Sequence, residues 1–161
     1  MEVNLRRGIA KSMYYEEIME IEADLYSQQW TKTTLKRYLC DKEIIIATDP
    51  LGTFLGYCIF EQRKKFSHND VLYFYILRRL AVVESYQDCL IPRILKSISP
   101  KGRHIFCTLP LYDAKLLHQY CKYGFMPVRT IHDLFIVDDG VLLVFREVSK
   151  NLLKSEKKPP F

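Results

Sequence analysis

The sequence lacks any long apolar run and any internal repeat. Its longest apolar stretches fall far short of the roughly 20 residues that a membrane-spanning helix needs. The first residues, Met1 to Arg6, contain no apolar core of a secretory leader. From these absences we expect a cytoplasmic protein with no membrane partner.

The cysteines form neither a metal-binding nor a disulfide pattern. There are five, an odd number, and no two of them have C-x-x-C spacing. This arrangement argues against a zinc site and a disulfide framework, so we expect no metal cofactor. We interpret the thiols as small buried side chains in a reducing compartment.

The composition is that of an ordinary globular domain with a slight excess of positive charge. The 161 residues are 48% hydrophobic and 27% charged, which is enough for one domain with a real core. The net charge of +5 is spread along the chain and does not distinguish solubility from an anionic partner. The basic run Arg63-Lys64-Lys65 has no accompanying pattern of stacking aromatics, which argues against a nucleic-acid partner.

Hydrophobic periodicity predicts alternating helices and strands. We predict helices over 14–26, 32–40, 88–98 and 113–123, and strands over 3–6, 43–48, 53–61, 71–83, 104–109, 125–130 and 141–148. The polar segment 63–70 is predicted as a loop, Asp113 as a helix cap and Gly124 as a helix end. This order predicts an α/β domain over residues 1–149, with a central mixed sheet and helices on both faces. We expect the basic tail, 150–161, to be flexible.

The segment from Leu77 to Leu95 is the most informative, because a buried strand there leads through a tight turn into a helix. The N–H groups and the dipole of a helix N-terminus are suited to bind the phosphates of a cofactor. Glycine is usual in such a turn, since the backbone must approach the phosphate closely. Between Gln87 and Pro92 there is none.

Several motifs occur in a familiar order along the chain. They are Leu55-Gly56 in a strand, Leu77-Arg78-Arg79-Leu80-Ala81-Val82, Ser85-Tyr86-Gln87, the segment Asp113-Ala114-Lys115-Leu116-Leu117-His118-Gln119-Tyr120-Cys121-Lys122-Tyr123-Gly124-Phe125, and Gln29-Trp30-Thr31. With them the chain, from Val3 to Glu147, resembles the GNAT superfamily of acetyl-CoA-dependent N-acetyltransferases. Gln29-Trp30-Thr31 resembles a tryptophan segment of relatives that acetylate protein N-termini.

The resemblance implies a GNAT-like fold with a mostly antiparallel sheet, and transfer of an acetyl group from acetyl-CoA to a primary amine of a protein or small molecule. The pantetheine arm would hydrogen-bond where strands 71–83 and 104–109 splay apart. Tyr120 would protonate the leaving thiolate. The implied donor-binding residues are Leu80, Ala81, Val82, Gln87, Asp88, Cys89, Leu90, Ile91, Arg93 and Asp113. Relatives are often dimers, and we expect strand 141–148 to offer an exposed edge for a homodimer.

The chain departs from the family's cofactor loop, Q/R-x-x-G-x-G/A. Leu90 and Pro92 stand at the two small positions, and Pro92 has no N–H to donate. Losing one charge-assisted hydrogen bond costs ~1.5–3 kcal/mol, or roughly ten- to a hundred-fold in affinity. Asp88 adds a negative charge near the expected phosphates, which Arg93 and Lys96 would offset in part.

The residues expected to handle protons are also incomplete. Ile76 and Thr108 stand where some relatives carry a general base. Tyr120 has two interpretations, a proton donor or an aromatic core residue of its helix. Arg78 and Arg79 are expected to point to opposite faces of their strand. A second hypothesis is therefore a catalytically degenerate GNAT-fold protein that serves as a binding or interaction module.

Overall fold

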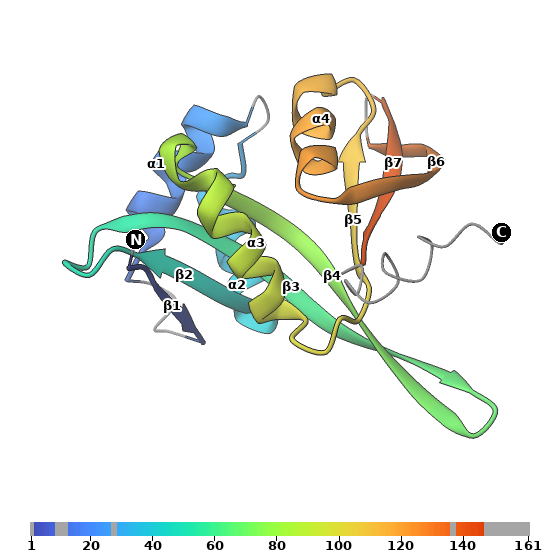
Figure 1. Cartoon of the computed structure of the whole chain (residues 1–161). Coiled ribbons are helices and arrows are strands. Elements are labelled where there is room, and N and C mark those ends of the chain that lie inside the picture. The colour runs from blue at the N-terminus through green and yellow to red at the C-terminus, as the bar shows by residue number, and fades with distance from the viewer. Residues whose placement is uncertain (1, 9–12, 27–28, 136–137, 147–161) are drawn as a thin grey trace, which may run out of the picture.

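The computed structural model describes residues 2–8, 13–26, 29–135 and 138–146. They contain one seven-stranded sheet in the order β1-β2-β3-β4-β5-β7-β6 (Figure 1). The strands are β1 (Asn4–Arg7), β2 (Glu43–Thr48), β3 (Phe54–Ser67), β4 (Asp70–Val82), β5 (Ile105–Pro110), β6 (Phe125–Phe135) and β7 (Asp138–Phe145). Only the β4–β5 pair is parallel, so the predicted mixed, mostly antiparallel α/β sheet is confirmed. The predicted tail, 150–161, lies outside the described residues.

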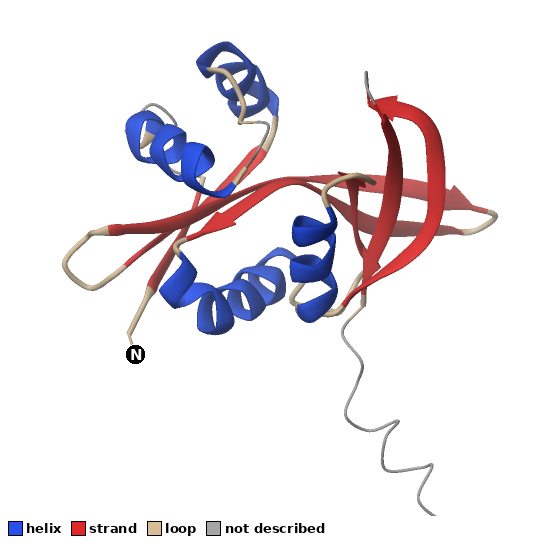
Figure 2. Cartoon of the chain, turned by 90° about the horizontal axis from the view of Figure 1, so that it is seen from above, coloured by secondary structure: helices blue, strands red, loops and turns tan. Residues whose placement is uncertain are grey.

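Helices cover both faces of the sheet (Figure 2). On one face lie α1 (Tyr15–Leu25) and α2 (Lys32–Asp41), and on the other lie α3 (Gln87–Ile98) and α4 (Ala114–Lys122). A short 3-10 turn, Glu84–Tyr86, leads from β4 into α3. Asp113 caps α4 by accepting from the N–H of Leu116 at 3.1 Å, as predicted. The chain then turns at Gly124, whose φ of +100° belongs to the left-handed region.

The segment predicted as a loop, 63–70, is instead the far end of a long hairpin. The ladder between β3 and β4 continues from Arg63, opposite Phe74, to Ser67, opposite Asp70. The β-branched and aromatic side chains of β4 supply strand-forming partners that outweigh the polar character of β3. Only a two-residue turn remains, in which His68 has a φ of 42°. The hairpin projects beyond the rest of the sheet (Figure 1).

The sheet has a different edge from the one predicted for a dimer. β7 lies between β5 and β6, with Thr108 opposite Leu142 on one side and Thr130 opposite Val141 on the other. Both edges of β7 are therefore hydrogen-bonded, and the outer strand is β6. The expectation of an exposed edge at 141–148 is wrong where the structure describes it, because strand order depends on long-range pairing.

A β-bulge in β4 interrupts the regular alternation of side chains between the two faces of the sheet at Arg78 and Arg79. Ile59 is opposite Arg79 and Phe60 is opposite Leu77, so Arg78 is an extra residue on β4. A bulge of this kind turns two successive side chains to the same side. Arg79 binds Glu22 of α1, and Arg78 binds Glu61 of β3. The prediction of opposite faces is therefore wrong.

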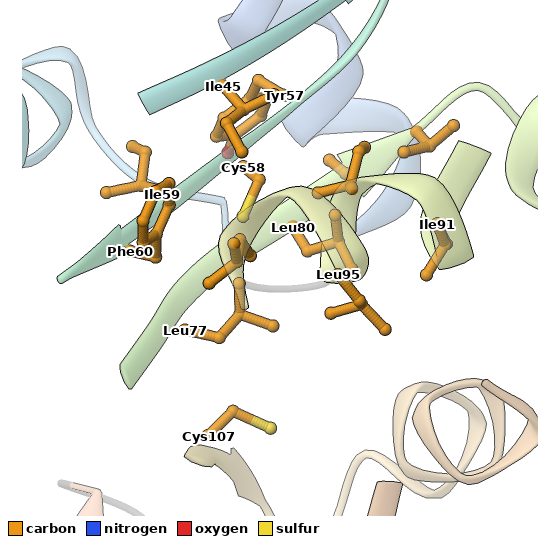
Figure 3. Packing of buried hydrophobic residues seen from close by; sticks show 14 of the residues in the cluster. Ile45, Tyr57, Cys58, Ile59, Phe60, Leu77, Leu80, Ile91, Leu95 and Cys107 are labelled. Atoms are coloured by element: carbon orange, nitrogen blue, oxygen red, sulfur yellow. The ribbon is translucent and has the colours of Figure 1, made fainter. Parts of the chain in front are cut away.

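The hydrophobic core fills the space between the sheet and its helices (Figure 3). On α3 the buried residues are Leu90, Ile91, Ile94, Leu95 and Ile98. Leu90 has no exposed surface, so the side chain that stands in the family's glycine position is a core residue. The α3 helix begins at Gln87, and Pro92 lies inside it. Pro92 thus removes one helical N–H donor.

The cysteines are only partly buried. Cys58 and Cys107 lie in the core, where burial raises the pKa of both thiols. Cys40, Cys89 and Cys121 are exposed, which corrects the expectation that all five are buried. None of the five is in a disulfide.

We predict that replacing Leu90 with the glycine of the family pattern destabilises the protein. The substitution removes a fully buried side chain and adds a glycine to a helix, which together cost about 3–6 kcal/mol of unfolding free energy. Urea denaturation measures the change. Cys89→Gly is the matched control, since that side chain is exposed and only roughly 0.3 kcal/mol of helix propensity is lost. Equal effects of the two substitutions would show that Leu90 does not anchor α3.

Candidate functional site

The site begins where two parallel strands separate. β4 and β5 pair only at Tyr75–Ile105 and Ile76–Phe106, and beyond these residues the strands diverge toward their carboxyl ends (Figure 1). From Leu77 to Val82, β4 stays paired with β3 on its other side. The predicted splay between these strands is confirmed. One edge of β4 is consequently available to a ligand or to other side chains.

A buried ion pair lies behind this opening. Glu22 of α1 has no exposed surface, and its Oε2 lies 2.5 Å from Nη2 of Arg79. The same carboxylate accepts from the hydroxyl of Tyr57 and, at 3.2 Å, from the backbone N–H of Trp30. These donors compensate for the removal of the charge from water.

The ion pair explains the aromatic residues that follow α1. The Arg79 guanidinium lies 3.4 Å from the ring centroid of Tyr26 and 5.0 Å from that of Trp30. The Trp30 ring also stacks on Tyr38 at 4.4 Å. In this structure Trp30 therefore joins Arg79 of β4 to Tyr38 of α2. Sequence reasoning missed Glu22, although a glutamate four residues after buried Ile18 lies on the apolar face of the helix.

Tyr120 lies at the opening and is almost fully buried. Its hydroxyl is hydrogen-bonded to that of Tyr26, and its ring lies 5.3 Å from that of Phe125. Burial, followed by the nearby Tyr26, raises the pKa of Tyr120 well above its ordinary value. Tyr120 therefore stays protonated but is a weaker acid than an exposed tyrosine, and its packing suits a core residue as well. The catalytic role stays a prediction.

Side chains of the protein occupy the open edge of β4. The Tyr26 hydroxyl donates to the carbonyl of Leu80, and Nε2 of Gln87 donates to the carbonyl of Val82 at 3.0 Å. Nε2 of Gln119 on α4 in turn donates to Oε1 of Gln87 at 2.7 Å. We call Gln87, Gln119 and the Val82 carbonyl the glutamine latch. Sequence reasoning assigned Gln87 to the donor but missed its role in this contact.

Little space remains between the latch and the core. The cavity bounded by Leu80, Val82, Ile91, Leu116, Gln119 and Tyr120 has a volume of ≈20 Å³. Such a volume accommodates about one water molecule. A pantetheine arm is far larger than this cavity, so the side chains that line it would have to move to admit one.

The first turn of α3 carries its own negative charge. The carboxylate of Asp88 lies 3.0 Å from the Lys122 ammonium and 3.1 Å from the Tyr123 hydroxyl, and these hydrogen bonds lower the pKa of Asp88. A carboxylate near a helix N-terminus interacts favourably with the helix dipole and competes with a phosphate. The arrangement at α3 therefore stabilises the helix without a bound anion.

The other predicted donor residues lie in different surroundings. Cys89 is exposed on the first turn of α3, and its thiol donates to the carbonyl of Tyr86. Leu90 and Ile91 are buried in the core, so only their backbone is left for a ligand. Arg93 donates to the carbonyl of Val3 at 3.1 Å, next to β1. Ala81 is buried in β4, opposite Tyr57.

A pocket of ≈310 Å³ adjoins the opening. Residues from several elements line it, among them Trp30, Arg79, Thr108, Asp113 and Tyr120. Asp113 is the only carboxylate residue that lines it among the residues that the structure describes. The pocket is large enough for an amine-bearing side chain or chain end. Tyr120 also borders the small cavity, and Tyr26 and Leu116 likewise line both spaces.

Searches for metal sites and membrane spans found no candidate in the part of the chain that the structure describes. No three of its His, Cys, Asp and Glu side chains gather as ligands for a metal ion. Within the same residues, no helix combines the length and the apolar character needed to cross a membrane.

Comparisons with known proteins find relatives only by structure. No family model and no curated sequence matches the chain. The NatC complex bound to Gag peptide and CoA contains a chain that is 14% identical with a TM-score of 0.62, covering 92% of this chain and 100% of that one. NAA60 of Arabidopsis thaliana in complex with a bisubstrate analogue is 17% identical with a TM-score of 0.65, covering 90% and 98%.

A bacterial enzyme extends the comparison. The ribosomal-protein-S18-alanine N-acetyltransferase of Escherichia coli is 12% identical with a TM-score of 0.63, covering 93% of this chain and 98% of that one. At such identities the likeness carries the fold and not the activity. The sheet with its β4–β5 splay and the near-complete coverage of each similar structure lead to the same conclusion. The chain has the fold of the GNAT N-acetyltransferases.

Proposed function

We propose that this protein is an acyl-CoA-dependent N-acetyltransferase that acetylates a primary amine of a protein or peptide. The observation that supports it best is the position of Tyr120, which with Tyr26 lies between the small cavity beside β4 and the ≈310 Å³ pocket. A thioester reaching the opening would have the phenol beside its sulfur, and an amine would approach through the pocket. The similar structures include an acetyltransferase of a ribosomal protein and one of the small amine spermidine, so the choice of a protein or peptide acceptor rests on the resemblance of Gln29-Trp30-Thr31 to the segment of N-terminal acetyltransferases.

The reaction is a direct transfer between two bound substrates. The lone pair of a neutral amine attacks the thioester carbonyl carbon, the new C–N bond forms, and the C–S bond breaks. The leaving thiolate takes a proton from Tyr120, and the proton lost by the amine passes through water to restore the phenol. The raised pKa of Tyr120 keeps the phenol protonated before transfer and also makes it a weaker acid, so the transfer depends on the basicity of the leaving thiolate.

Donor binding requires opening of the glutamine latch. The backbone of Leu80, Ala81 and Val82 would hold the pantetheine, and the first turn of α3 would hold the pyrophosphate. Release of the Val82 carbonyl by Gln87 exposes the acceptor that such an arm needs. Pro92 is the sixth residue of α3, so the N–H that it lacks would have bonded within the helix, and the expected loss of a phosphate donor there is wrong. Asp88 still places a carboxylate at the phosphate end, so we infer a donor affinity that depends mainly on the pantetheine half.

A second candidate function has its own support. The occupied carbonyls of β4, the buried Leu90 and the carboxylate of Asp88 all stabilise the fold without a ligand. These features favour a GNAT-fold protein that no longer acetylates and serves as a binding module. The two candidates differ in one property, which is whether CoA binds.

Titration calorimetry with acetyl-CoA and with CoA tests the proposal. We expect binding at or below millimolar concentration, and tighter binding by about two- to ten-fold in Gln119→Ala, because that variant removes the partner that holds Gln87. Gln62→Ala on β3 is the control, and its affinity should equal that of the unmodified protein. If neither acetyl-CoA nor CoA binds to either variant at millimolar concentration, the result would favour a GNAT-fold binding module that does not acetylate.

Replacement of Tyr120 by phenylalanine tests the catalytic assignment. We expect kcat to fall by about a hundred-fold, because the thiolate loses its proton donor, with little change in acetyl-CoA affinity. Steady-state kinetics on an amine-bearing peptide and calorimetry measure the two quantities. Tyr15→Phe on α1 is the control, since Tyr15 lines neither space at the opening. Unchanged kcat would make Tyr120 a core residue.

A further inference from the structure

A larger trough runs from the proposed acceptor pocket along the sheet. It has a volume of ≈760 Å³ and is lined by residues of β3, β4, β5 and β7, of the connection before β5, and by Arg146 after β7. The trough shares Arg78 and Thr108 with the ≈310 Å³ pocket, so the two spaces adjoin. Lys65, Leu72, Tyr73 and Phe74 extend it onto the β3–β4 hairpin, which projects beyond β5 and β7 (Figure 1).

The floor of the trough lies on the face of the sheet that carries α1 and α2. Ile76 pairs with Glu61, which lies on the same side of β3 as Tyr57, the partner of Glu22 on α1. Phe106 lies beside Ile76 in register. A chain that enters the proposed acceptor pocket from this face can therefore continue along the same surface.

The trough is positively charged. Its basic residues are Lys65, Arg78, Arg103 and Arg146, and no aspartate or glutamate lines it among the described residues. Arg78 is paired with Glu61. Within the described part of the chain, no carboxylate forms a salt bridge with Lys65, Arg103 or Arg146, and all three are exposed. Three cations therefore face solvent around one hollow.

The aromatic side chains of the trough suit contact with a polypeptide better than stacking with nucleic-acid bases. Phe74 meets Phe106 edge to face, with centroids 5.7 Å apart and an interplanar angle of 89°. The His104 ring lies at 70° to Phe106, and Lys64 lies over the ring of Tyr73 at 5.6 Å. Several ring faces are thus already engaged. Base stacking needs open ring faces, whereas an extended peptide needs apolar area and polar edges.

The length of the trough suits a short extended segment. From Leu72 to Arg78, both of which line it, β4 rises roughly 20 Å at about 3.3 Å per residue. An extended peptide of about six residues has the same length. The positive charges are distributed along this path, from Arg78 near the proposed acceptor pocket to Lys65 on the hairpin.

We propose that the trough binds acidic residues of a polypeptide acceptor, within about six residues of the amine that is acetylated. This inference rests on the proposed function, because it takes the amine to lie in the ≈310 Å³ pocket. Aspartate and glutamate carboxylates pair with Lys65, Arg103 and Arg146, and the backbone lies over Phe74 and Phe106. The trough thereby selects substrates by charge outside the reacting centre.

Fluorescence anisotropy of labelled peptides tests the proposal on the full chain. One peptide of about eight residues has a free terminal amine followed by aspartates and glutamates, and its counterpart has asparagines and glutamines. We expect the acidic peptide to bind about ten-fold more tightly at low ionic strength, with a preference that weakens as salt is added. Arg103→Glu or Arg146→Glu should abolish most of the preference. Arg6→Glu on β1, at the far edge of the sheet, should leave it unchanged.

Each outcome decides between the proposals. Equal affinity for the two peptides, or an effect of Arg6→Glu as large as that of Arg103→Glu, overturns the acidic-acceptor assignment. A single-stranded oligonucleotide that binds more tightly than the acidic peptide and depends on Arg103 assigns the trough to nucleic acid instead. If the rate of acetyl transfer is the same for the acidic and the neutral peptide, only the assignment of the trough to acidic residues is overturned. Charge-dependent peptide binding without CoA binding or acetyl transfer supports the trough and overturns the proposed enzyme.

Discussion

The buried pair of Glu22 and Arg79 is the contact on which the site depends. A carboxylate with no exposed surface tolerates burial only because Arg79, Tyr57 and the N–H of Trp30 all donate to it. The β-bulge at Arg78 turns Arg79 toward α1, so the pair joins the helix to β4 at the edge of the splay. Tyr26 then lies against Arg79 and reaches both Tyr120 and the Leu80 carbonyl. One ion pair thus organises both walls of the opening.

The start of α3 shows a conflict between packing and phosphate binding. A glycine lets a backbone approach phosphate closely, while a leucine at the same place fills the core. Here Leu90 is buried and Asp88 supplies the charge that the helix dipole favours. The glutamine latch similarly satisfies the Val82 carbonyl without a ligand. The same contacts stabilise the protein without a ligand and would have to be replaced when acetyl-CoA binds.

Local patterns predicted the elements well where a segment forms its own hydrogen bonds or has its own apolar face. The four helices and the capping of α4 by Asp113 follow this rule. The predictions failed where the partner is distant in sequence. Arg63 to Ser67 became strand because β4 pairs with it, and β7 became an inner strand because β6 covers its edge. The bulge at Arg78 left no local signal, since it arises from the register between two strands.

The sequence alone determined the class of fold, the β4–β5 splay and the identity of the groups available at it, Gln87 and Tyr120 among them. The class of fold follows from periodicity, capping and motif order, which are properties of short segments, whereas the splay and the roles of Gln87 and Tyr120 were implied by the resemblance to the GNAT superfamily. Only the tertiary structure decided that Gln87 holds the Val82 carbonyl and that Glu22 is paired with Arg79. It also gathered Lys65, Arg103 and Arg146 around one trough. The physical reason is that hydrogen bonds and charge interactions depend on how close two groups lie in space. Residues far apart in the chain become neighbours only when the sheet forms.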